Sequence, residues 1–324
     1  MYLNSIFLIH FTRGILYFNG ALSTKEQTTC GPVFSLLDLC AQNTTMNSSI
    51  SKIGFLGAGQ IAQAMAKGFL KNGLIKAEAV VASVHPSDKA SYESNKALGI
   101  KTYTENAPLV QMSNVIFISV KPYVVPSVLS EIKPASDGKL FISVANGINL
   151  DVLERGLSSC ARVIRVMPNT PSTVQSGCSV FARGSKATDE DAILTQSLME
   201  AVGTCEEVEE KLMNPITALS GSGPAYVFVM IEALADGAVR MGVPRDLAYR
   251  LASQTVMGSG QMVRDTGEHP GVLKDNVTSP AGSTAAGLKY LEEAGFRAAV
   301  SGAVETATLR CRQISQEFQN ESNW

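Results

Sequence analysis

A glycine-rich turn between an apolar strand and a helix constrains the fold of this 324-residue chain more than any other feature. The apolar run Ile53–Leu56 leads into Gly57-Ala58-Gly59-Gln60-Ile61-Ala62, and a helix-forming stretch continues to Leu70. Strand, G-x-G-x-x-A and helix, in this order, make up the dinucleotide-binding fingerprint. Gly57 permits the tight turn, and Gly59 lets a diphosphate approach the backbone.

Buried strands recur after this turn. We expect them at residues 79–83, 115–120, 140–145 and 163–167, separated by helical stretches. Because these runs are apolar on both faces, they predict a Rossmann-type doubly wound parallel sheet in an α/β fold. Ligands bind such sheets outside the carboxyl ends of the strands, where the loops at Lys121-Pro122, 146–147 and 168–171 fall. We therefore expect Lys121 to contact a cofactor. The alternative is that Lys121 is an ordinary surface lysine.

The second strand of the sheet bears on cofactor choice. Sites that prefer NAD usually carry an acid at its end, but here Ser83 and Val84 are followed by polar and basic residues up to Lys89. Such groups favour the 2′-phosphate, so we expect NADPH to be preferred and NADH to be possible. The alternative is that Glu78 or Asp88 folds back and takes the role of the acid.

From about residue 188 the pattern turns helical, with a capping-box sequence over 188–191 and a first helix at 192–202. Further helices are expected at 225–241, 244–267 and 296–316. The stretch 225–241 is apolar nearly all round, which predicts burial. Helices this apolar in a small domain need another surface to cover them, so we expect a homodimer of the helical domains.

The expected domain organisation has three parts. Residues 1–50 form a poorly ordered N-terminal extension, 51–212 an NAD(P)-binding Rossmann domain, and 213–324 an all-helical substrate and dimerisation domain. The extension holds only two basic residues, Arg13 and Lys25, and no apolar span of the ~20 residues that a membrane helix needs. We expect a cytoplasmic protein, with a mitochondrial location as the alternative.

A turn rich in small and hydroxyl residues, Asn276–Thr284, runs directly into an amphipathic stretch that ends near Glu292. The first backbone N–H groups of a helix have no partner within it and, with the helix dipole, they attract a small anion. Gly282 allows close approach to the main chain, and Ser279, Ser283 and Thr284 add hydroxyls. The turn therefore predicts a seat for a carboxylate or phosphate, or, alternatively, an ordinary helix N-cap.

The composition limits the classes of partner that the chain is expected to bind. A net charge of −2 without a Lys/Arg block predicts neither nucleic acid nor a membrane as partner. Six scattered cysteines without a C-x-x-C pair, and three histidines, predict no metal site. His269 precedes a proline and is expected to be a loop or cap residue rather than a general acid.

Five segments together resemble the Δ1-pyrroline-5-carboxylate reductases, which perform the last step of proline synthesis, and the resemblance spans about residues 52–316. The segments are 57–60, 120–122, 167–171, 219–226 and, most specifically, 277–288. The resemblance implies NAD(P)H-dependent reduction of the C=N bond of a cyclic imine that carries a carboxylate. It also implies a homodimer, which in many relatives is the unit of a ring of five dimers, and hence a decamer here.

The resemblance also implies the site residues. Thr284 is the expected catalytic residue, with its hydroxyl near the ring nitrogen of the substrate. The other expected substrate contacts are Glu210, Asn276, Ser279, Gly282 and Ser283. The expected cofactor contacts are Leu56, Gly57, Ala58, Gly59, Gln60, Ile61, Ser83, Val84, Asn106, Val120, Lys121, Pro122, Asn146 and Asn276. Relatives commonly carry Ala-Ala-Gly where this chain has Ala145-Asn146-Gly147, which places a polar side chain near the expected nicotinamide.

Two other functions fit parts of the sequence. A β-hydroxyacid dehydrogenase or another imine reductase shares the two-domain plan, but the helical half lacks the Gly-Gly-x-x-x-x-x-Lys helix of the hydroxyacid enzymes. A redox-sensing module that binds NADPH without turnover needs no anion seat at 279–284, so the presence of that turn favours an enzyme.

Overall fold

The computed structural model describes residues 51–321, with side chains to residue 319, and all of them lie in the compact unit Asn43–Trp324. The expected extension at 1–50 lies outside the described residues.

An eight-stranded sheet forms the first part of this unit, in the order β3-β2-β1-β4-β5-β6-β7-β8. Its pairs are parallel except β6 with β7, which is antiparallel. The strands are β1 (Ile53–Leu56), β2 (Val80–Ser83), β3 (Lys101–Tyr103), β4 (Val115–Ile118), β5 (Leu140–Ser143), β6 (Arg162–Met167), β7 (Gly177–Arg183) and β8 (Gly203–Glu207). The predicted Rossmann-type sheet is confirmed.

Helices cover both faces of the sheet. One face packs on α2 (Gln60–Lys71) and α7 (Asp189–Glu200), and the other on α4 (Asn106–Met112), α5 (Val125–Ile132) and α6 (Leu150–Gly156). The short helix α3 (Lys89–Ala97) precedes β3. Phe55 and Phe117 stack within the first layer, with ring centroids 4.9 Å apart. These layers fix the carboxyl ends of β1, β4 and β5 relative to one another.

Strand β8 corrects the expectation that the chain is helical from residue 188 onward. It is an outer strand of the sheet, and only Cys205 of its five residues is buried. A strand with a single buried side chain lacks the apolar run from which the inner strands were predicted.

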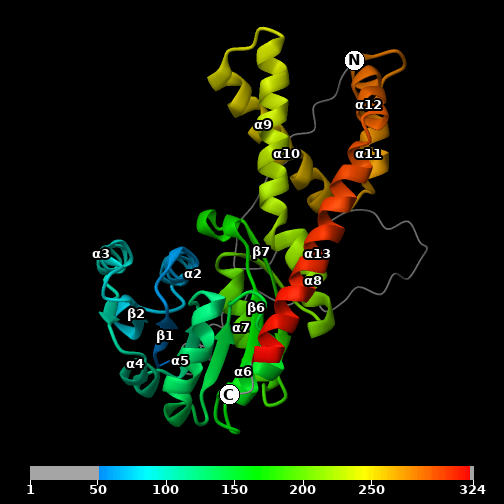
Figure 1. Cartoon of the computed structure of the whole chain (residues 1–324). Coiled ribbons are helices and arrows are strands. Elements are labelled where there is room, and N and C mark those ends of the chain that lie inside the picture. The colour runs from blue at the N-terminus through cyan, green and yellow to red at the C-terminus, as the bar shows by residue number, and fades with distance from the viewer. Residues whose placement is uncertain (1–50, 322–324) are drawn as a thin grey trace, which may run out of the picture. The chain divides into compact units, whose positions relative to one another are not determined.

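The second part of the unit is helical. It comprises α8 (Met213–Ile216), a π-turn at Thr217–Gly221, α9 (Gly223–Arg240), α10 (Arg245–Thr266), α11 (Pro270–Asn276), α12 (Ser283–Glu293) and α13 (Phe296–Glu321). Helices α9 and α10 pack side by side (Figure 1). His269 is the N-cap of α11, where its Nδ1 accepts a hydrogen bond from the N–H of Gly271, as its expected role as a cap residue requires.

The expectation that 225–241 is buried is wrong for the single chain. Only Ala235 of α9 is buried, whereas the side chains of Phe228 and Val229 are 61% and 66% exposed. The stretch Glu210–Arg240 is also long and apolar enough to meet a length-and-hydropathy criterion for a membrane span. Since α9 packs mainly on α10, its remaining apolar faces have no covering surface within the described chain.

Candidate functional site

The glycine-rich turn between β1 and α2 has the geometry of a phosphate cradle. Gly57 has φ of +89°, and a Cβ there would lie 2.9 Å from the backbone nitrogen of Val120. Gly59 is the N-cap of α2, and a Cβ there would meet no atom within 4 Å. No side chain caps α2 and no acid lies in its first turn. The turn therefore combines open space with free N–H donors, which fits the diphosphate of a dinucleotide.

The other residues expected at this turn surround the cradle. Leu56 and Ala58 are buried, Ile61 is half-buried and Gln60 is exposed. The hydroxyl of Ser83, at the end of β2, accepts a hydrogen bond of 3.2 Å from the N–H of Gly57. Ser83 thereby holds the turn from the neighbouring strand.

Val84 belongs to the hydrophobic core, with its side chain 7% exposed. Its side chain is therefore turned away from the surface, and its backbone N–H bonds the carbonyl of Tyr103. Asp88 caps α3 by accepting a hydrogen bond from the N–H of Ser91, which lowers the pKa of its carboxyl. This engagement weakens the alternative in which Asp88 acts as the acid of an NAD site.

Asn106 begins α4, and its side-chain amide donates to the carboxylate of Glu131 at 2.7 Å. Val120, half-buried, lies directly over Gly57, and the exposed Lys121 caps the short helical turn Pro122–Val124. Because β2, β1, β4 and β5 are consecutive neighbours in the sheet, the loops at 83–84, 57–59, 120–122 and 145–149 follow one another along one edge. A dinucleotide lies extended across such an edge.

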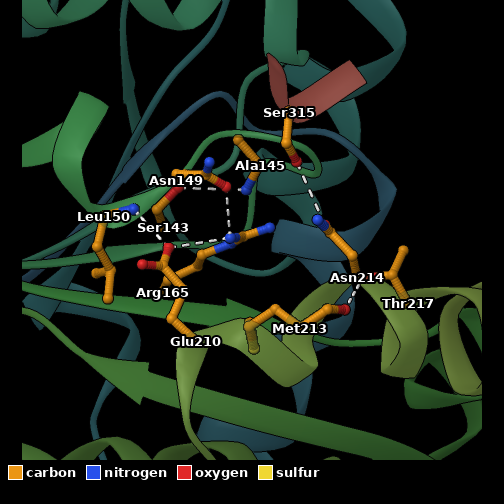
Figure 2. Close-up of polar contacts among 10 residues, drawn as sticks. All are labelled: Ser143, Ala145, Asn149, Leu150, Arg165, Glu210, Met213, Asn214, Thr217 and Ser315. Carbon is orange, nitrogen blue, oxygen red and sulfur yellow. Dashed lines mark hydrogen bonds and ion pairs between the residues drawn. The ribbon is translucent and has the colours of Figure 1, made fainter. Parts of the chain in front are cut away.

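The last of these loops is held by a buried polar cluster that sequence reasoning missed (Figure 2). Arg165 of β6 has a side chain only 4% exposed, and one of its terminal nitrogens donates to Asn149 at 2.9 Å and to Glu210 at 3.0 Å. Burial lowers the pKa of the Arg165 guanidinium, while the hydrogen bond to Glu210 acts in the opposite direction. A charged residue within the apolar run 163–167 was the available signal.

Glu210, expected to contact substrate, has other partners in the structure. Its Oε1 accepts the Arg165 hydrogen bond and a second one, of 2.7 Å, from the N–H of Leu150 at the start of α6. The carboxylate thus ties the loop after β5 to the segment that leads into α8.

The turn before α12 leads into an uncapped helix start, the feature on which the predicted anion site depends. Gly282 is the N-cap of α12 with no side-chain cap, and the side chain of Ser279 lies so close that a Cβ on Gly282 would overlap its hydroxyl. Ala281 adopts φ of +57° and tightens the turn. Ser279 and Ser283 are exposed and Thr284 is half-buried. The N–H groups at the start of α12 and these hydroxyls are available to a ligand.

Within the described chain, the turn and the cofactor loops are not brought together. Apart from the bonds within helices α11 and α12, the hydrogen bonds of residues 276–284 join them to residues between 274 and 286. Asn276, expected to contact both ligands, is the exposed last residue of α11. Among the described residues, no group of three or more His, Cys, Asp and Glu side chains could hold a metal ion.

Two families match the chain, one in its helical part and one in its sheet part. Residues 210–314 match the family described as pyrroline-5-carboxylate reductase dimerisation, and residues 52–147 match the family described as NADP oxidoreductase, coenzyme F420-dependent.

Curated relatives match over most of their length. The chain is 45% identical to a pyrroline-5-carboxylate reductase of Arabidopsis thaliana over 266 residues, which is 82% of this chain and 96% of the relative. It is 42% identical over 273 residues to pyrroline-5-carboxylate reductase 2 of Rattus norvegicus, covering 83% and 85% of the two chains. A Plasmodium falciparum pyrroline carboxylate reductase, solved with NADP bound, superposes with a TM-score of 0.75 at 35% identity, covering 82% of this chain and 98% of that one.

Proposed function

The chain belongs to the pyrroline-5-carboxylate reductase family, and from this premise we propose how its residues carry out the reaction. It is an NAD(P)H-dependent oxidoreductase that reduces the C=N bond of 1-pyrroline-5-carboxylate to give L-proline. The observation that carries the proposal is the coexistence of an open glycine cradle at α2 and an uncapped, hydroxyl-rich helix start at α12.

The cofactor half of the site uses the edge of the sheet. The N–H groups at the start of α2 bind the diphosphate beside Gly59, and the loops at Val120–Lys121 and Asn146 receive the nicotinamide end. When bound, NAD(P)H supplies a hydride. The protein contributes position, which can lower a barrier by up to ~7–11 kcal/mol when two reactants are well oriented.

The substrate half uses the turn before α12. Its N–H groups at Ser283 and Thr284, beside Gly282, bind the carboxylate, helped by the Ser279 hydroxyl, and the Thr284 hydroxyl hydrogen-bonds the ring nitrogen. A protonated imine is already electrophilic and loses its positive charge as hydride adds to carbon. The residues therefore need to orient the two reactants rather than supply a strong acid, which agrees with the absence of a histidine among the expected site residues.

The two halves of one site come from two copies of the chain. This proposal rests on the hydrogen bonds of the turn, which outside the helices reach only residues near it in the described chain, and on the uncovered apolar residues of α9. The match to a dimerisation family supports a homo-oligomer. A decamer of five such dimers is the assembly we propose.

We propose NADPH as the preferred cofactor, with NADH also used. The support is that β2 ends at Ser83, without an acid, and that Asp88 is engaged in capping α3. We further propose a cytoplasmic location, with mitochondria as the alternative, because residues 1–50 contain only two basic side chains. Imaging the full chain with a C-terminal tag tests the location.

One assay tests the function and the cofactor preference together. Absorbance at 340 nm is followed with pyrroline-5-carboxylate and either NADPH or NADH, and NADPH is expected to give the higher kcat/KM. A β-hydroxyacid dehydrogenase would instead turn over hydroxyacids, and a redox-sensing module would bind NADPH without consuming it. Absence of turnover with both cofactors would overturn the proposal.

A further inference from the structure

The loop after β5 packs against the rest of the chain and exposes the side chain of Asn146. Asn146 is exposed, whereas Gly147 and Ile148 are buried and Asn149 is half-buried. Gly147 has φ of +82°, and a Cβ there would lie 2.7 Å from the Cγ2 atom of Ile314 on α13. Helix α13 therefore closes over the loop from the helical part of the chain.

The polar cluster behind the same loop fixes its other end. Arg165 bonds the side chain of Asn149, and Glu210 joins Arg165 to the N–H of Leu150. The three bonds hold two consecutive residues of the chain against β6 (Figure 2). Since the Arg165 side chain is almost fully buried, its guanidinium has little access to water, which strengthens its two bonds and holds the loop in one position.

We propose that Arg165 is a positioning residue for the nicotinamide end of the cofactor. Through Asn149 and Glu210 it fixes loop 145–149, and the loop in turn holds Asn146 at the edge of the sheet beside Lys121. Glu210 then acts through this loop rather than by contact with substrate. The inference rests on the proposed function, because it takes the nicotinamide to lie at this loop.

Two ligands test the proposal: NADPH, and 2′-phospho-ADP-ribose, which is the same molecule without the nicotinamide. Their dissociation constants are measured calorimetrically without substrate for the wild type, Arg165→Met, Asn149→Ala and Asn149→Asp. Arg165→Met and Asn149→Ala are expected to weaken NADPH binding about tenfold and to leave 2′-phospho-ADP-ribose within twofold. Asn149→Asp keeps the accepting oxygen and is expected to bind NADPH like the wild type.

Arg162→Met is the matched control. Arg162 starts the same strand and forms an ion pair of 2.8 Å with Asp191, at the end of β6 away from the loop. The Arg162→Met variant should bind both ligands like the wild type. Asn149→Ala removes only a half-buried amide and covers the case in which Arg165→Met does not fold.

Equal weakening of both ligands, or no change in either, overturns the positioning role. A wild type that binds neither ligand and does not reduce pyrroline-5-carboxylate overturns the proposed function, and the inference with it. Wild-type turnover combined with unchanged variants overturns the inference alone.

Discussion

A methyl group added at Gly59 should strongly weaken cofactor binding without harming the fold. Gly59 has φ of −71° and ψ of −174°, which alanine adopts freely, and a Cβ there meets no protein atom within 4 Å. Alanine reduces the entropy of the unfolded chain but is a poorer N-cap than glycine, so the two effects oppose each other. The expected change in the free energy of unfolding is within about 1 kcal/mol.

The same methyl group occupies the space where the diphosphate meets the start of α2. Losing two charge-assisted hydrogen bonds, at about 1.5–3 kcal/mol each, corresponds to a rise in the NADPH dissociation constant of roughly 10²–10⁴-fold. Fluorescence titration with NADPH measures the binding, and thermal unfolding at one fixed protein concentration measures the stability.

Gly57→Ala, at the other glycine of the cradle, should instead lower the stability of the fold. It forces alanine to φ of +89° and places its Cβ 2.9 Å from the backbone of Val120, so it should cost about 2–5 kcal/mol of stability. Gly73→Ala, just beyond the other end of α2, also has a positive φ but open space, and should leave NADPH binding unchanged. A Gly59→Ala protein that binds NADPH within threefold of the wild type refutes the cradle.

Three further predictions follow from other parts of the molecule. Thr284→Ala should lower kcat/KM for pyrroline-5-carboxylate about 10–100-fold, as loss of one positioned hydrogen bond does, and an unchanged steady-state value would contradict its catalytic role. Phe228→Asp should dissociate the oligomer in analytical ultracentrifugation, whereas Val174→Asp should not, although Val174, on the sheet domain, is even more exposed than Phe228. Burial raises the pKa of Cys205 from 9.0 to about 12, so above pH 9 the unfolded thiol ionises while the folded one stays protonated. The free energy of unfolding in urea should therefore fall between pH 9 and 12, and Cys205→Ala should fall less steeply; parallel slopes would count against the buried thiol.

The sequence predicted the elements whose own residues carry the signal. Strands β1, β4 and β5 were found because each is an apolar run, and the cradle because Gly57 and Gly59 lie between such a strand and a helix, whereas the inner strand β7 was not predicted. Strand β8 was missed since its side chains are mostly polar at the edge of the sheet. The exposure of α9 in the single chain was missed because the apolar pattern of a helix is the same whether its own chain or a second copy covers it.

The polar cluster could not have been read from spacing. Arg165 lies 16 residues from Asn149 and 45 from Glu210, and only the fold brings the three together. Its one visible sign was a charge inside an apolar strand. Glu210 was assigned to substrate by resemblance, and in the structure its Oε1 accepts hydrogen bonds from Arg165 and Leu150.

The separation of the hydroxyl-rich turn from the glycine cradle within one chain has a consequence for mixed assemblies. If each reaction centre takes one half from either copy, a subunit damaged in the cradle and a subunit damaged in the turn have complementary defects. Pairing them leaves one centre with both defects and the other fully intact, so two inactive proteins regain activity when their subunits exchange. Conversely, a chain damaged in both the cradle and the turn disables both centres of its dimer, and its effect on a population of dimers exceeds its share of the protein.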